Sequence, residues 1–307
     1  MEPVTSSLEH VTRLTRDLRD ASVTLSEDEA RFLVDYYYAM QEDRIRAGAQ
    51  VRSLVESSEP HSVIAWLGGN VAVLEQQIKR ALDAYTDSQT VGVWAKSIVG
   101  IGPIIAAGLS AHIDIKKAPT VGHIWRFAGL DPTVTWEKKT RRPWNASLKT
   151  LCWKIGESFV KVSGHEEDVY GKLYLERKAF EQANNLSGSL SAQATAKLER
   201  FKIGKDTDAR IWYAGCLTHE SARLIIESPS EKRLGLAKKL AGEPGTGVAM
   251  LPPAHIHARA KRWAVKLFLA HWHAVAYRAH FGQDAPKPYV ISQLQHGHEI
   301  VAPNWPF

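Results

Sequence analysis

Apolar residues recur every three or four positions along the first part of the chain, a spacing that predicts two long helices. The first begins at the capping box Ser26-Glu27-Asp28-Glu29 and continues to about Ser57. The second begins near Pro60 and carries an apolar stripe of the amphipathic or coiled-coil kind. Its positions are Ile64, Leu67, Val71, Leu74, Ile78 and Leu82. We therefore expect a long, coiled-coil-like helical hairpin over residues 25–90, preceded by a flexible arm at residues 1–24.

From Val91 the pattern changes to short helices separated by Gly and Pro, which predicts a helix-hairpin-helix core over residues 91–165. Further helical patterns fill residues 166–252, which we interpret as a helical insertion. Pro252-Pro253 then opens a closing amphipathic helix, so the last segment, residues 253–307, consists of that helix and a Pro-rich tail. No convincing series of alternating strands occurs, and the sequence therefore predicts an all-α fold.

The composition favours an anionic partner without identifying one. The chain has 307 residues, of which 39 are Lys or Arg and 33 are Asp or Glu, giving a formal net charge of +6. With only Cys152 and Cys216, neither a disulfide framework nor a thiolate zinc site is indicated. The longest apolar runs are far short of a membrane span, and the N-terminus has no apolar core of the signal-peptide type. We expect a soluble, cytoplasmic protein that does not engage a membrane.

The sequence Gly100-Ile101-Gly102-Pro103 lies between an apolar helix end and an apolar helix start, which is the pattern of a helix-hairpin-helix. The glycines permit a tight turn, and Pro103 presets the first turn of the second helix. Amides around Ile101 and Gly102, with the helix N-terminus behind them, would then point at one anion. A nucleic-acid phosphate is the natural candidate. The alternative is an ordinary turn between two helices that only packs.

Two basic regions follow the predicted hairpin. The first has six basic residues with no acid among them: Lys138, Lys139, Arg141, Arg142, Lys149 and Lys154. Trp136, Trp144 and Trp153 are interleaved with them, and such a mixture suits phosphate contacts and base stacking. The second is a stripe on the predicted closing helix, formed by Arg259, Arg262, Lys266 and His273. Each region has a plainer interpretation. The first could be a solvated basic loop whose tryptophans lie in the core, and the second could be the solvent-exposed face of a core helix.

Several motifs, taken in order, resemble the C-terminal transposase domain of the DEDD-type insertion-sequence transposases, which act with an element-encoded bridging RNA. These motifs are Leu74-Glu75-Gln76-Gln77-Ile78, residues 97–103 with Ala106-Ala107-Gly108-Leu109, residues 127–132, Asn145-Ala146-Ser147-Leu148-Lys149 and Ala258-Arg259-Ala260-Lys261-Arg262. The resemblance covers about residues 70–165 and 253–280, interrupted by the insertion. It implies nucleic-acid binding, DNA recombination or transposition, and a mobile-element or phage setting.

Two departures from the family pattern leave strand cleavage unassigned. Family members begin with a RuvC-like α/β domain whose four acidic residues bind metal ions, whereas residues 1–70 predict no strands with acids at their ends. The family's nucleophilic serine follows its Ala-Gly-Leu-x-Pro motif, where this chain reads Thr133-Val134-Thr135-Trp136-Glu137. No catalytic residue can therefore be named, and enzymatic activity stays open. Mg²⁺ would be required only if the protein were catalytic.

Histidines concentrate near the end of the sequence, which raises a metal site as a hypothesis. Seven of the 13 lie in the last 53 residues: His255, His257, His271, His273, His280, His296 and His298. His271 and His273 are two apart on a predicted helix and point about 200° apart, so they cannot ligate one ion together. The remaining pairs could do so only in loops, and we expect neither a metal site nor a cofactor.

From these patterns we expect a DNA-binding protein related to a mobile-element transposase, which clamps phosphates with its helix-hairpin-helix. Structured RNA is an alternative ligand, because a phosphate clamp does not read the sugar. Two other functional classes stay open. One is an active recombinase that acts with a partner or through an unidentified nucleophile. The other is a helical, oligomeric interaction protein. Whichever class applies, we expect a homo-oligomer that forms through the N-terminal helices.

Overall fold

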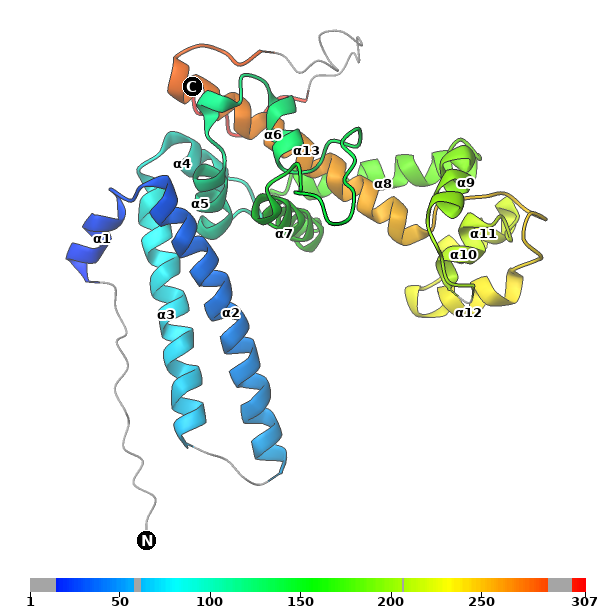
Figure 1. Cartoon of the computed structure of the whole chain (residues 1–307), viewed down its shortest axis with the longest axis horizontal. Helices are drawn as coiled ribbons and strands as arrows, with labels where there is room; N and C mark the ends of the chain where they lie inside the picture. Colours follow the sequence, from blue (N-terminus) through cyan, green and yellow to red (C-terminus); the bar gives the residue numbers. More distant parts are fainter. Residues whose placement is uncertain (1–14, 58–61, 206, 287–299) are drawn as a thin grey trace. The chain divides into compact units, whose positions relative to one another are not determined.

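The computed structural model describes residues 15–57, 62–205, 207–286 and 300–307. Within these residues there are thirteen α-helices, one short 3-10 helix and no strand, which confirms the predicted all-α class (Figure 1). Across the same residues, no helix combines the length and the apolar character that a membrane crossing requires.

The helices vary widely in length, and α2, α3 and α13 are the longest. In chain order they are α1 (Arg16–Ser22), α2 (Glu27–Glu56), α3 (Ser62–Asp87), α4 (Thr90–Lys96), α5 (Pro103–His112), η1 (Ile115–Lys117), α6 (Val121–Phe127), α7 (Ala146–Val162), α8 (Tyr170–Leu186), α9 (Ser191–Arg200), α10 (Asp208–Tyr213), α11 (His219–Glu227), α12 (Ser230–Leu240) and α13 (Pro253–Phe281).

The chain divides into two compact units. Unit 1 contains the described residues up to Ile155 together with those from Phe268 onward, and unit 2 is Gly156–Leu267. The boundaries therefore fall inside α7 and α13, whereas the sequence pattern placed the ends of the insertion near residues 165 and 252. A helix that runs through a boundary leaves no break in local pattern for sequence analysis to detect.

Helix α2 begins as its capping residues predict. At the start of α2 the amide of Glu29 donates to Ser26 Oγ at 3.3 Å, and the amide of Ser26 donates to Glu29 Oε2 at 2.8 Å. This reciprocal pair confirms the predicted capping box. Within the segment predicted to be a flexible arm, Arg16–Ser22 form α1, with Thr15 as the N-cap. The earlier part of that arm, residues 1–14, lies outside the described residues.

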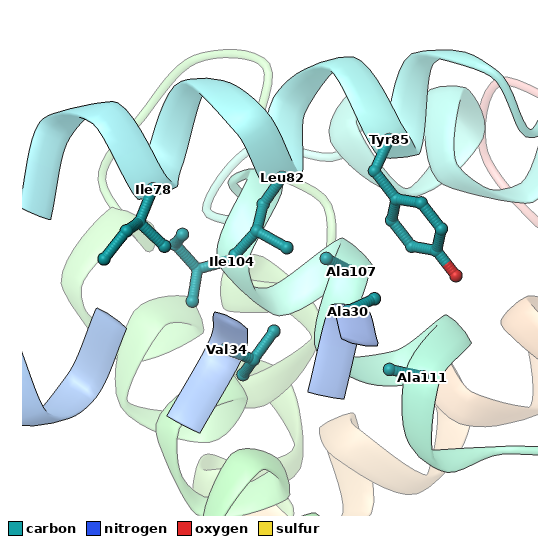
Figure 2. Packing of buried hydrophobic residues seen from close by; sticks show 8 residues of the cluster. All are labelled: Ala30, Val34, Ile78, Leu82, Tyr85, Ile104, Ala107 and Ala111. Carbon is teal, nitrogen blue, oxygen red and sulfur yellow. The ribbon is translucent and has the colours of Figure 1, made fainter. Parts of the chain in front are cut away.

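The core of unit 1 is formed where α2, α3 and α5 meet. Figure 2 shows its buried side chains, which are Ala30, Val34, Ile78, Leu82, Tyr85, Ile104, Ala107 and Ala111. The alanines of α5 are small enough to let that helix approach the longer two closely. Between α2 and α3, Arg44 Nε lies 2.6 Å from Glu75 Oε2, and only 3% of the Glu75 side chain is exposed.

Unit 2 is built from α8 to α12 with the adjoining parts of α7 and α13. Trp212, Leu217 and Ile225 are fully buried in its main apolar cluster. Buried Glu181 of α8 binds Arg177 at 2.6 Å and Arg259 of α13 at 2.9 Å. These bonds hold the pKa of Glu181 below its ordinary value although burial opposes them. The carboxylate thus ties α8 to the first half of α13.

Candidate nucleic-acid interface

The two glycines of the turn between α4 and α5 differ in backbone conformation and in their place in the turn. Gly100 has φ of +92°, in the left-handed region that glycine adopts without strain. The Ile101 amide donates to the carbonyl of Ile98 at 2.9 Å, and its side chain is 4% exposed. Gly102 is exposed and forms the N-cap of α5, with no side-chain cap hydrogen bond. The amide predicted at Ile101 is therefore satisfied internally, and the outward-facing part of the turn is Gly102.

The N-terminus of α5 is open to solvent at Gly102. A Cβ placed on this residue would meet no atom within 4 Å. Pro103 occupies the first helical position, as predicted, and brings no N–H of its own. The tail runs beside the turn, where the Asn304 side-chain amide donates to the Ser97 carbonyl at 3.2 Å, yet Gly102 stays exposed. The partial positive charge at this helix end is thus accessible to an anion.

The basic loop, residues 136–145 between α6 and α7, places cations over aromatic rings. The Arg142 guanidinium lies 5.4 Å from the Trp136 ring centroid, and Lys149 Nζ, in the first turn of α7, lies 4.0 Å from that of Trp144. The two indoles meet edge to face with their centroids 6.3 Å apart. Trp136 is 38% exposed. These contacts order the side chains while leaving charge and ring surface at the exterior.

Four cations of the basic loop are exposed and form no ion pair anywhere in the part of the chain that the structure describes. They are Lys138, Lys139, Arg141 and Arg142. Lys154, by contrast, is half-buried with its Nζ 3.3 Å from the Tyr38 ring centroid, and burial lowers the pKa of this lysine. Of the six basic residues expected here, Lys154 therefore packs inside unit 1.

The Trp144 ring packs directly against the backbone of Gly129. The φ of this glycine is +65°, and a Cβ on it would lie 2.8 Å from the Trp144 ring. The amide of Asn145 donates to the Phe127 carbonyl at 2.8 Å, and Asn145 Oδ1 accepts from the Leu148 amide at 2.9 Å, capping α7. The motifs at residues 127–132 and 145–149, quoted separately from the sequence, therefore fold against each other.

Positive charge is concentrated in one part of unit 1. Residues 115–154 contain nine Lys and Arg but only two acids, Asp131 and Glu137, which is a net charge of +7 against +6 for the whole chain. Sequence reasoning overlooked the exposed Lys116, Lys117 and Arg126 in this stretch. The scarcity of acids, which extends upstream to residue 115, was the signal that could have found them.

A cleft of about 680 Å³ in unit 1 adjoins the basic loop through Pro143. Its lining mixes cationic Arg31, Lys117 and Arg126 with acidic Glu27, Asp28 and Asp114. The Lys117 ammonium lies 3.1 Å from Asp114, and Arg31 lies 2.9 Å from Asp28. Because its charges are largely paired, this cleft is a weaker anion site than the loop beside it.

The predicted basic stripe on α13 is mostly engaged in intramolecular contacts. Arg259 binds Glu181, as described above, and also donates to Gln193 Oε1 at 2.7 Å. Lys266 is half-buried and engaged in a contact within the chain. His273 is 2% exposed, with its Nε2 2.8 Å from the Ala118 carbonyl oxygen. Arg262 is the one exposed member of the four, so we do not include this stripe in the interface.

The C-terminal histidines take part in hydrogen bonds that fix the packing. His255 Nδ1 lies 2.8 Å from the Tyr213 hydroxyl, and His257 Nδ1 lies 2.7 Å from that of Tyr174. Burial, reinforced by nearby arginines and lysines, lowers the pKa of His255 to about 4. His296 and His298 lie outside the described residues. Among the residues that can be described, no three His, Cys, Asp or Glu side chains form a possible metal site.

Thr133 begins the segment where the resemblance implies a nucleophilic serine, and it is held in a local turn. Its hydroxyl donates to Asp131 Oδ1 at 2.7 Å, and its amide donates to the same oxygen at 2.9 Å. This is the ordinary geometry of an Asx turn. It assigns no reaction to Thr133.

In comparisons with known proteins, no family model, no curated protein and no solved structure matches the chain. The transposase resemblance accordingly depends on the quoted motifs alone.

Proposed function

We propose that the protein binds DNA, with the basic loop as the main phosphate-contacting surface and the N-terminus of α5 as a second anion contact. The observation that carries this proposal is the group of four exposed, ion-pair-free cations beside exposed indole surface, within a segment of net charge +7. Cations that have no carboxylate partner among the described residues are available to neutralise phosphates. Exposed indole faces add stacking for bases that are unpaired or distorted.

Phosphate contacts do not distinguish the sugar of DNA from that of RNA. We therefore choose DNA on the basis of the transposase resemblance. The proposal is confined to binding, because Thr133 is held in an Asx turn and no cluster of possible metal ligands occurs among the described residues. Electrostatic contacts of this kind release counterions, and the affinity should therefore fall steeply as salt rises.

The test is a salt-dependent binding series on duplex DNA, branched DNA and structured RNA. We expect the double variant Arg141→Gln/Arg142→Gln to weaken DNA binding about tenfold or more at low salt, and to reduce the slope of log K against log salt by about two. The matched control is Lys232→Gln/Lys239→Gln, which removes the same charge from exposed positions on α12.

Equal losses in the two double variants would mean that net charge, rather than the basic loop, drives binding, and would contradict the proposal. Tighter binding to structured RNA than to both DNAs would indicate that the basic loop binds RNA rather than DNA. Absence of binding to any nucleic acid at low salt would favour the interaction-protein class.

A further inference from the structure

Unit 2 contains a second concentration of positive charge, inside a pocket of about 310 Å³ formed by α8, α12, the end of α11 and the start of α13. Its polar lining is Lys178, Gln182, Asn185, Arg233 and His257, and its apolar lining is Ile226, Leu251, Pro253, Ala254 and Ile256. No carboxylate is among these lining residues. Two cations therefore share a concave site without a counter-ion from the pocket wall.

Lys178 and Arg233 are both half-buried. Neither forms an ion pair with any acid in the described residues. Burial lowers the pKa of Lys178, and the nearby charge of Arg233 lowers it further. Holding two like charges together in a partly desolvated site costs free energy, and a bound anion would remove that cost.

The Arg233 guanidinium is held in place by backbone carbonyls. Its Nε donates to the Ser228 oxygen at 2.9 Å, and Nη2 donates to the Ile226 oxygen at 2.8 Å. These acceptors are neutral, so they orient the guanidinium without cancelling its charge. Nη1 makes no hydrogen bond to any residue for which the structure gives a position, so its hydrogens can serve another acceptor, and a fixed fork of this kind suits phosphate oxygens.

The start of α13 adds a third source of positive potential. The Pro252 carbonyl accepts the amides of His255 at 2.8 Å and Ile256 at 3.1 Å. Ala254 lines the pocket, and its amide has no acceptor within the described part of the chain. Because α13 extends over 29 residues, the full partial charge of a helix N-terminus lies beside the two cations.

The walls of the pocket are held rigidly. Asn185 is 1% exposed, and its side chain makes two hydrogen bonds to Leu251, one to the carbonyl at 2.9 Å and one from the amide at 2.8 Å. This fixes the segment that leads into α13 against α8. His257 is oriented by the Tyr174 hydroxyl, and burial lowers its pKa, so the imidazole is neutral at neutral pH.

We propose that this pocket binds a phosphate monoester. The dianion matches the two formal charges of Lys178 and Arg233, the α13 amide donates to a phosphate oxygen, and the apolar wall receives the esterified group. The pocket volume is at the lower end of the range for small-molecule sites, which suits a ligand of this size. The monoester could belong to a free small molecule or to the 5′-terminal phosphate of a strand.

A plainer role exists for Arg233, since its two carbonyl acceptors lie at the C-terminal end of α11 and such bonds also cap a helix. That role does not require Lys178. The decisive variants are therefore at Lys178 and Gln182, with Arg233 left intact.

The experiment is isothermal titration of the full-length protein with inorganic phosphate and with phenyl phosphate. We expect saturable binding of one molecule per chain, with phenyl phosphate binding more tightly because of the apolar wall. Lys178→Gln should weaken it about tenfold or more. Gln182→Glu should abolish it and raise the unfolding temperature, because the new carboxylate would pair with Lys178. The control Lys232→Gln removes a neighbouring exposed charge outside the pocket and should leave binding unchanged.

The source of the phosphate is resolved by competition in the Arg141→Gln/Arg142→Gln background, where oligonucleotide binding at the basic loop is weakened and cannot be mistaken for binding in the pocket. Displacement of phenyl phosphate by a 5′-phosphorylated oligonucleotide, but not by its 5′-hydroxyl form, assigns a strand end. Displacement by neither oligonucleotide assigns a free small phosphate. Non-saturable titration, or equal affinity in the Lys178→Gln variant, overturns the proposal.

Discussion

Gly100 and Gly102 are two residues apart and have different physical requirements. The positive φ of Gly100 excludes most side chains, so the turn itself depends on that glycine. Gly102 has an ordinary extended backbone, with φ −96° and ψ 177°, and open space around its missing Cβ. The fold does not require glycine at 102, and the residue can therefore be changed to test the surface without disturbing the turn.

At Gly102 we predict that substitution by Asp will weaken DNA binding more than substitution by Asn. Both are good N-cap residues and nearly equal in size, so either should change the free energy of unfolding by less than about 1 kcal/mol. Gly102→Asp puts a carboxylate where a phosphate would dock and should weaken DNA binding about tenfold relative to Gly102→Asn. Fluorescence anisotropy at low salt measures the ratio. Equal affinities would exclude the α5 N-terminus from the interface.

At the scale of the element, α3 shows how far an apolar stripe specifies the packing of a helix. Ile78 and Leu82 are buried as the stripe predicts, but Leu67 is 52% exposed and Leu74 is 37% exposed. Glu75, between Leu74 and the buried Ile78, is 2% exposed because it binds Arg44 of α2. The spacing of apolar residues predicts the helix, but packing against α2 determines which positions of α3 are buried.

The Arg44–Glu75 pair predicts that a second substitution will offset most of the stability lost through the first. Arg44→Leu leaves a buried carboxylate without its partner and should lower the free energy of unfolding by about 2 kcal/mol, a value discounted because Arg44 is 43% exposed. Adding Glu75→Leu should recover most of that loss, since the desolvated charge is gone. Urea denaturation of the two singles and the double measures the coupling. A double variant less stable than Arg44→Leu would contradict this account.

At the scale of the whole molecule, buried histidines in unit 1 and half-buried histidines in unit 2 link stability to pH. Burial is the largest cause that lowers the pKa of His112 and His273 in unit 1 and of His255 and His257 in unit 2. A histidine that resists protonation when folded binds fewer protons than in the unfolded chain. Stability is therefore complete above the unfolded pKa of 6.5 and is lost as pH falls from there toward the folded value, about 4 for His255.

We predict that the free energy of unfolding will decline steadily as pH is lowered from about 6.5 to about 4. His255→Asn, which can still accept the Tyr213 hydroxyl, should flatten this decline in unit 2. His280→Asn, at an exposed position, is the matched control and should leave the slope unchanged. Denaturation followed at several pH values tests this, and the same slope in both variants would contradict it.

The sequence by itself determined the helical class, the capping box at Ser26, Pro103 at the start of α5 and the acid-poor basic stretch. These features depend on residues within a few positions of one another, where local geometry and composition suffice. The tertiary structure alone decided that Arg259 is engaged by Glu181, that Trp144 lies on Gly129, and that Lys178 shares a pocket with Arg233. Such contacts join residues that are distant in sequence and come together when apolar surfaces are buried. The local sequence around each residue does not specify them.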